Sequence, residues 1–288
     1  SYITMGRALR KVVSLFDPLE DLVSEYDRRE ELRVQREEDE DDTPVKHTLE
    51  QDRLYRGFQE LLKFVPGLKL VLVNTHPLEL AEIYSQLRKG AASAHGDDTG
   101  SVRAAMVEWV PKGTKEPLIA TSRVNRGIES EVTGPLICPV DYDLADPEVR
   151  AKIADGDSAF KITADQWPRG VYFNSVYDPV DEEKGLFKSS SLVQTFLHIF
   201  TSPQSAVKFE AEDASGEENV RPAGAGPPRK KRKHRFSLSD ALQWNEQDGD
   251  FDYVLYYSNI VDWFEASPGP IAQKKVDELL AWWDRYVL

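Results

Sequence analysis

The segment GPPRKKRKHRFS, from Gly226 to Ser237, places six Lys and Arg side chains and one His in seven consecutive positions of a chain whose formal net charge at pH 7 is -14. The basic side chains are Arg229, Lys230, Lys231, Arg232, Lys233 and Arg235. Lysine supplies point charges and arginine supplies planar guanidinium forks, and a short run of both is typical of nuclear-import signals. The cluster therefore predicts a nuclear location and a nuclear-import receptor as one partner.

Two other interpretations of the basic cluster remain open. The cluster could be a solvated charge run that neutralises the acidic stretch FEAEDASGEE, and the protein would then be cytoplasmic. It could also bind the phosphates of a nucleic acid. However, no aromatic residues are interleaved for base stacking, and the acidic remainder of the chain repels nucleic acid, so we expect no direct nucleic-acid binding.

Two serines near the cluster have the sequence context that acid-directed kinases favour. Ser215 has Glu218 three residues on, and Ser237 has Asp240 three residues on. A phosphate adds about -1.5 to -2 charges at neutral pH. Phosphorylation at Ser237 would therefore tune the binding of an import receptor to the neighbouring cluster.

Oxygen ligands for a metal ion are concentrated in CPVDYDLADPE, where Asp141, Asp143 and Asp146 could coordinate Mg²⁺ or Ca²⁺ if the loop curled around an ion. This pattern carries the alternative hypothesis of a metal-dependent enzyme that acts on nucleic acid. The competing interpretation is a polar loop in which Asp146 caps the helix that follows.

Other chemical signals are absent or isolated. The chain lacks GxxxxGK(S/T), GxGxxG, HExxH and GxSxG patterns, so we expect no cofactor and favour a protein that is not an enzyme. His198 lies among apolar neighbours, which is typical of a core histidine with its hydrogen bonds satisfied. Cys138 is the only cysteine, which excludes an intrachain disulfide, and we interpret it as a small buried hydrophobe.

The elements that would position these residues are mostly helices. Apolar stripes predict helices over about 48–65, capped by Thr48, and over about 76–90, ended by Gly90. The turn AHGDDTGS then precedes a third stripe that ends near Trp109. Residues 111–186 have the closely spaced Pro, Gly and Asp of long ordered loops, and KSSSLVQTFLHIFTSP predicts a central core helix. A closing helix with Trp283 should pack back onto the core.

The expected fold class is mostly α, an irregular helical bundle with long ordered loops and a disordered basic insertion. Residues 1–35 form an N-terminal helical segment and 36–47 an acidic linker. Residues 48–203 and 236–288 form the helical domain, interrupted by a disordered loop at 204–235 that carries the basic cluster. No apolar run approaches the roughly 20 residues of a membrane-spanning helix, so no membrane partner is expected.

Six blocks of sequence carry a resemblance when they are taken in order. They are YITMGRALRKVVSLFDPL, KGAASAHGDDTGSVRAAMVEWV, GPLICPVDYDLADPEVRAKIADG, ITADQWPRGVYFNSVYDP, GLFKSSSLVQTFLHIFTSPQSA and VDELLAWWDRYV. Together they resemble an uncharacterised family, a domain of unknown function, that is abundant in mushroom-forming fungi. The chain departs from the family pattern at Glu183 and Lys184, where an aromatic PW-x-G type of sequence is expected. The resemblance implies a fungal intracellular protein and supplies no catalytic residues.

These observations favour a nuclear-targeted, non-enzymatic interaction protein. In this hypothesis the helical body offers a surface to an unknown protein partner, and the basic insertion displays the import signal. The metal-dependent enzyme built around the three aspartates is the alternative.

Overall fold

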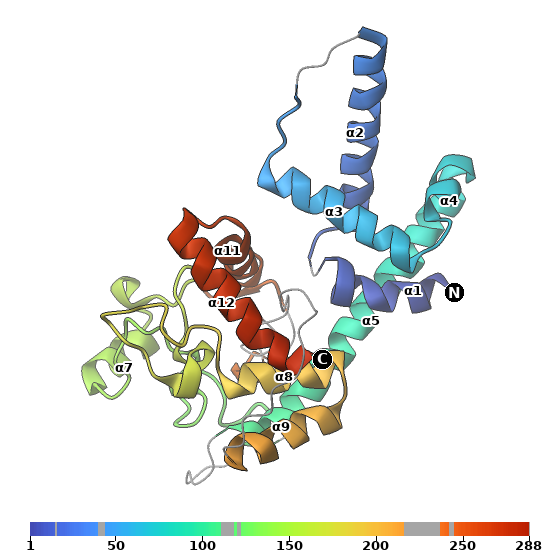
Figure 1. Ribbon diagram of the computed structural model, residues 1–288. Coiled ribbons are helices and arrows are strands. Elements are labelled where there is room, and N and C mark those ends of the chain that lie inside the picture. Colours follow the sequence, from blue (N-terminus) through green and yellow to red (C-terminus); the bar gives the residue numbers. More distant parts are fainter. Residues whose placement is uncertain are drawn as a thin grey trace. The chain divides into compact units, whose positions relative to one another are not determined.

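The computed structural model describes residues 1–14, 16–39, 44–110, 118–119, 122–215, 237–241 and 245–287. They divide into two compact units, Ser1–Asp97 and Asp98–Leu288. The predicted mostly α fold is confirmed, since the strands described form one two-stranded hairpin (Figure 1). None of the helices among the described residues is long and apolar enough to cross a bilayer.

Unit 1 contains α1 (Tyr2–Ala8), the π-helical turn η1 (Leu9–Val13), α2 (Leu19–Asp39), α3 (Leu49–Phe64), α4 (Leu68–Asn74) and the first part of α5 (Pro77–Trp109). Thr48 caps α3 as predicted. Its side chain accepts the N–H of Gln51 at 3.2 Å, and the Gln51 side chain accepts the N–H of Thr48 at 2.9 Å. This capping box fixes the start of α3. The apolar face of α3 carries Phe58 and Leu61, which form one buried cluster with Leu22 of α2.

Helix α5 corrects two predictions. Gly90 does not end a helix, and AHGDDTGS is not a turn, because α5 continues without interruption through both. Gly90 serves close packing instead, since a Cβ there would overlap the carbonyl oxygen of Ile3 in α1. Gly6 of α1 meets the carbonyl of Leu87 in the same way. The two glycines thus let the backbones of α1 and α5 touch.

Two predicted unstructured segments begin as helices. The acidic linker expected at 36–47 is helical at its start, because α2 extends to Asp39. Arg33 pairs with Glu30 and Glu37 there, which offsets the repulsion between acidic side chains. The insertion expected at 204–235 is likewise helical at its start, since α9 spans Pro203–Ser215 and buries Ala206. Residues 40–43 and 216–236 lie outside the described part of the chain.

Unit 2 holds the second part of α5 and the remaining elements. They are α6 (Gly134–Ile137), α7 (Pro147–Ala154), the 3₁₀ turns η2 (Ser158–Phe160), η3 (Arg169–Val171) and η4 (Phe173–Ser175), α8 (Ser190–Phe200), α9, β1 (Gln247–Asp248), β2 (Phe251–Asp252), α11 (Tyr253–Glu265) and α12 (Pro270–Val287). The long ordered loops expected before α8 are present over residues 122–189, with only short helical turns.

Helix α8 packs against α9 and α12, as predicted for a central helix and a closing helix (Figure 1). Trp283 of α12 is buried and lies edge-on to Phe196 of α8, with ring centroids 5.7 Å apart. Its indole N–H donates to the carbonyl oxygen of Phe187 at 3.1 Å. The closing helix is therefore joined both to α8 and to the end of the loop that precedes it.

Candidate functional site

The predicted import signal, Arg229 to Arg235, lies outside the described residues. Of the two predicted phosphorylation sites, Ser215 is the last residue of α9, and Ser237 is fully buried with 0% of its surface exposed. The carbonyl oxygen of Ser237 accepts a hydrogen bond from Arg126. A kinase therefore reaches Ser237 only when this segment opens.

The three aspartates proposed as metal ligands are exposed, and two of them stabilise turns. Asp143 accepts the N–H of Ala145, and Asp146 accepts the N–H of Glu148, each at 2.9 Å. Asp146 is thus the N-cap of α7, as the competing interpretation predicted. Within the described ranges, no group of three or more His, Cys, Asp or Glu side chains is placed to hold a metal ion.

His198 and Cys138 occupy the packed environments that the sequence predicted. The Nε2 atom of His198 lies 2.5 Å from Oγ of Ser101, and its ring packs edge-on against Trp109. Burial lowers the pKa of His198, while the nearby Asp98 opposes this effect. Cys138 is buried, with its Sγ 3.8 Å from the carbonyl oxygen of Tyr142.

The sequence did not reveal the unusual backbone of the segment from Tyr172 to Phe187 in unit 2, termed here the 172–187 loop. The N–H of Phe173 donates to the carbonyl of Gly185 at 2.8 Å, and Tyr172 bridges to Leu186. These contacts close the base of the loop, while Phe187 is anchored through its bond to Trp283.

Three residues of this loop other than glycine adopt left-handed conformations: Asn174 (φ 52°), Ser175 (φ 55°) and Phe187 (φ 59°). Such conformations are rare for residues with a Cβ, particularly bulky ones, and cost on the order of 1–3 kcal/mol each. They persist only where the surroundings fix them. Non-glycine residues held in this way gather at binding and catalytic sites.

Packing around Phe187 explains how its conformation is held. Its fully buried ring meets the rings of Trp167, Trp263 and Phe264 at centroid distances of 5.1, 5.4 and 5.8 Å. Aromatic pairs at such distances each add about 0.5–1.5 kcal/mol beyond the area they bury. This cluster therefore offsets the backbone strain and makes the base of the loop rigid.

The loop presents apolar side chains to solvent. Phe173 is 49% exposed, Val176 65% and Val180 93%. Burying a valine side chain is worth about 1.5 kcal/mol or more, so each of these residues could contribute to binding. A rigid loop with exposed apolar groups is suited to contact another macromolecule, because little conformational entropy remains to be lost.

Acidic side chains surround the apolar ones. Asp178 pairs with Lys184 at 2.8 Å, and Glu183 pairs with Lys275 of α12. These pairs occupy the two positions at which the chain departs from the expected family pattern. By contrast, Glu182 and Asp141 form no ion pair within the described residues, although both lie close enough to Tyr177 to act on it.

This negative charge acts on two tyrosines of the loop, Tyr172 and Tyr177. Burial, followed by the charges of Glu182 and Asp141, raises the pKa of Tyr177. Burial also raises the pKa of Tyr172, and the same two carboxylates add to the effect. Asp141 therefore belongs to the acidic surroundings of the loop, together with a carboxylate that is distant in sequence.

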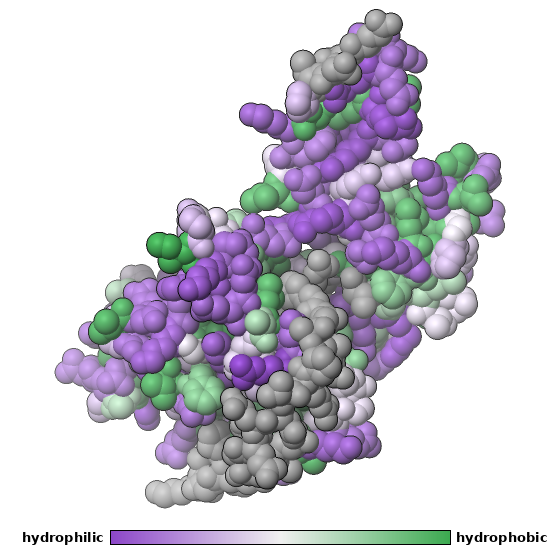
Figure 2. Space-filling model, viewed as in Figure 1, coloured by the Kyte–Doolittle hydropathy of each residue, from purple (hydrophilic) through white to green (hydrophobic). Residues whose placement is uncertain are grey.

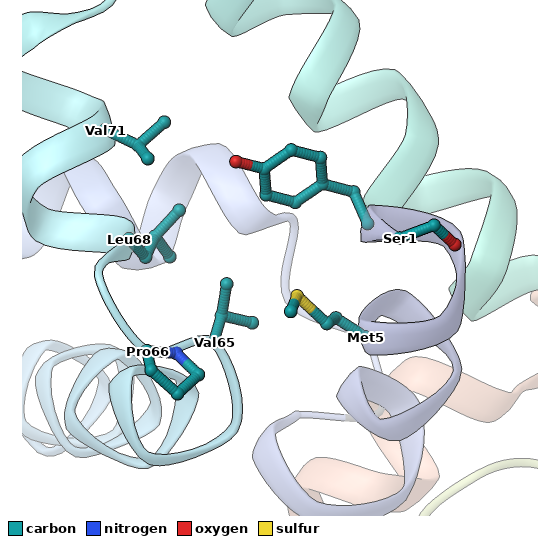
Figure 3. Close-up of a pocket in the computed structure, with 7 residues that line it drawn as sticks. Ser1, Met5, Val65, Pro66, Leu68 and Val71 are labelled. Atoms are coloured by element: carbon teal, nitrogen blue, oxygen red, sulfur yellow. The ribbon is translucent and has the colours of Figure 1, made fainter.

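Unit 1 has a separate apolar feature around α4. A cavity of about 160 Å³ is lined by Ser1, Tyr2, Met5, Val65, Pro66, Leu68 and Val71 (Figure 3). Ligand pockets usually measure about 300–1,000 Å³, so this cavity is the size for a side chain rather than for a cofactor. Leu70 and Val73 of α4 and Leu78 of α5 are exposed, and Figure 2 shows hydrophobic residues gathered over α4.

Comparison with known proteins assigns the chain to a family. Residues 89–288 match the sequence model of DUF6698, a family of unknown function, and this range is more than half of the chain. No curated protein and no solved structure matches. All of unit 2, including the 172–187 loop, lies in the matched range. The chain therefore belongs to the DUF6698 family, which confirms the resemblance to an uncharacterised family.

Proposed function

We propose that this chain is a nuclear-targeted, non-enzymatic interaction protein, and that the 172–187 loop of unit 2 binds a Lys- and Arg-rich segment of a partner protein. The observation that carries the proposal is the strained loop, which exposes Val176 and Val180 from a rigid aromatic base. Rigid exposed apolar groups are typical of interaction surfaces. Among the described residues, no group of three or more His, Cys, Asp or Glu side chains that could hold a metal ion accompanies them.

The negative charge around the 172–187 loop indicates a partner segment with positively charged side chains. Glu182 and Asp141 lie near Tyr177 without an ion pair among the described residues. Electrostatic complementarity steers partners and excludes those of like charge. A partner segment with Lys or Arg beside an aliphatic side chain would pair with the carboxylates and bury the exposed valines. The formal net charge of -14 supports the same choice, since it repels acidic partners.

The basic cluster is the basis for the proposed nuclear location. An acidic protein cannot use its average field to reach an import receptor, because the receptor's binding groove is itself acidic; a local concentration of positive charge is required. The cluster follows α9, which packs on α8, and precedes Ser237, which is buried in unit 2. The described residues that flank 216–236 therefore both belong to unit 2, the unit that carries the proposed binding loop.

Nuclear import is tested by replacing Lys230, Lys231, Arg232 and Lys233 with Ala in a fluorescent fusion too large to diffuse through the nuclear pore. The cells are fungal, as the resemblance implies. The wild type should accumulate in the nucleus, and the variant should remain in the cytoplasm with unchanged stability. Equal distributions of the two proteins would contradict import through this cluster and leave the binding role of the loop to its own test.

Binding is tested with a labelled peptide of alternating Lys and Leu, compared with peptides in which Ser replaces Leu or Glu replaces Lys. The wild type should bind the Lys and Leu peptide best. The double variant Val176→Ser, Val180→Ser should bind it at least about tenfold more weakly, since each buried valine is worth about 1.5 kcal/mol or more. Val207→Ser, another exposed valine of unit 2, is the matched control and should bind normally.

The charge of the loop is tested separately. Asp141→Asn with Glu182→Gln should weaken binding of the Lys and Leu peptide and reduce its dependence on salt, because screened charge pairs would be lost. Glu148→Gln, another exposed carboxylate of unit 2, should have no effect. If the wild type fails to bind, or if the loop variants bind as well as the controls, the loop is not the docking surface.

A further inference from the structure

One lysine of α12 contacts two carboxylates of the 172–187 loop. Nζ of Lys275 donates a hydrogen bond to a carboxylate oxygen of Glu183, which lies 92 residues earlier in the chain. The same nitrogen is 3.9 Å from a carboxylate oxygen of Asp181. The hydrogen bond to Glu183, together with the charges of both carboxylates, raises the pKa of Lys275. Lys275 therefore carries a positive charge at neutral pH and places it on the loop.

The base of the loop is held independently of this contact. The hydrogen bond from the N–H of Phe173 to the carbonyl oxygen of Gly185 closes it. The side chains of Lys275, Glu183 and Asp181 are 43%, 35% and 54% exposed. Ion pairs as exposed as these add little to the stability of a protein, because water and salt screen them. Lys275 can therefore leave the two carboxylates while the loop keeps its shape.

The two carboxylates lie in the same short stretch as an apolar group proposed to bind the partner. Asp181 directly follows Val180, which is 93% exposed, and Glu183 is three residues beyond Val180. A partner segment that buries Val180 brings its basic side chains close to these carboxylates. A lysine amine is a compact point charge, so Lys275 and a basic side chain of the partner compete for the same oxygens and repel each other.

We propose that Lys275 is an internal competitor of the partner that the 172–187 loop binds. It occupies Glu183 and Asp181, the acceptors for a second basic side chain in addition to the one that pairs with Glu182. The partner segment therefore carries two Lys or Arg side chains beside an aliphatic one, and the displacement of Lys275 sets its affinity. This inference rests on the proposed binding role of the loop.

The first experiment measures the affinity of the labelled Lys and Leu peptide for the wild type, Lys275→Gln and Lys274→Gln. Lys274 is the matched control, because it is the neighbouring residue of α12 and pairs with Glu278 of the same helix. Both substitutions change the net charge equally. At low salt, Lys275→Gln should bind the peptide about fivefold more tightly than the wild type, the effect of one unit charge at about 4 Å in water. Lys274→Gln should bind like the wild type.

A conservative substitution separates the charge of Lys275 from its packing. Lys275→Arg keeps the positive charge and should bind the peptide like the wild type. No gain in Lys275→Gln, or an equal gain in Lys275→Gln and Lys274→Gln, would overturn the competition and leave peptide binding by the loop intact. If neither the wild type nor any variant binds the peptide, the binding role of the loop fails, and the competition fails with it.

The displacement of Lys275 is measured directly by cross-linking. A carbodiimide couples a lysine amine to a carboxylate that it touches, so the wild type without peptide should give a product that joins Lys275 to Glu183. The Lys and Leu peptide should reduce the yield of this product, and the peptide with Glu in place of Lys should not. The proposal is overturned if the product does not form without peptide, or if its yield is unchanged when the Lys and Leu peptide is bound.

Discussion

At the scale of single residues, His198 gives unit 2 a pH dependence of defined sign. Burial lowers its pKa below the ordinary value, so the unfolded chain takes up a proton first as the pH falls through about 6.5. The contribution of neutral His198 to the free energy of unfolding is therefore fully present above that pH. It is lost as the pH falls toward the lower pKa of the folded state. Urea unfolding at pH 7.5 and pH 5.5 should show a larger loss of stability in the wild type than in His198→Gln.

The other titrating groups are shared by the two proteins, so the difference between their pH dependences isolates His198. If the wild type and His198→Gln lose the same stability between the two pH values, burial does not disfavour the protonated ring of His198.

At the scale of elements, the contact of α1 with α5 depends on glycines that the sequence interpretation assigned to a helix end. Gly90→Ala should destabilise unit 1 by about 1–3 kcal/mol, because the added methyl group overlaps the carbonyl of Ile3 and forces the helices apart. Gly96→Ala is the matched control in the same helix, since no atom lies within 4 Å of its added Cβ. It should stabilise the protein by about 0.5–1 kcal/mol, the usual advantage of alanine over glycine in a helix.

Denaturant unfolding measures both free energies. Stabilisation by both substitutions would show that α1 does not approach α5 as closely as described.

The helices themselves were largely predictable from local signals, and the error in α5 arose where tertiary packing outweighs those signals. Thr48 and the stripe through Phe58 and Leu61 are signals contained within α3, so periodicity revealed them. The glycines of AHGDDTGS were interpreted as a turn, yet burial of Ala94 and Val102 on either side keeps α5 continuous. Propensity costs about 1 kcal/mol per glycine, which tertiary packing readily exceeds.

The candidate sites were less predictable for the same reason. The left-handed conformation of Phe187 results from rings that are far away in sequence, such as Trp263. The hydrogen bond from Arg126 to the carbonyl oxygen of Ser237 likewise joins residues that are far apart in sequence. The sequence identified Asp146 as a cap because that bond joins neighbours. It could not show that Asp141 and Glu182 both act on Tyr177, because no sequence pattern links two carboxylates separated by forty residues.

At the scale of the whole molecule, each unit has its own buried core, one around Leu22 and Phe58 and the other including Val102 and Met106. Trp283→Ala should cost unit 2 about 3–5 kcal/mol, the usual range for a buried aromatic side chain. Scanning calorimetry should resolve two transitions, with Trp283→Ala lowering one and Gly90→Ala lowering the other. A single transition that both substitutions lower equally would show that the two cores unfold as one.

Helix α5 has a practical consequence for anyone who dissects this protein. The family match begins at residue 89, which lies inside α5, so a fragment cut at that limit would start in the middle of a helix. It would lose Pro77 and the native first turn, and it would lack the residues of unit 1 that form a buried cluster with Ala91. A fragment that starts before Pro77 keeps the native helix start. Domain limits derived from sequence similarity and limits suited to expression are therefore different in this chain.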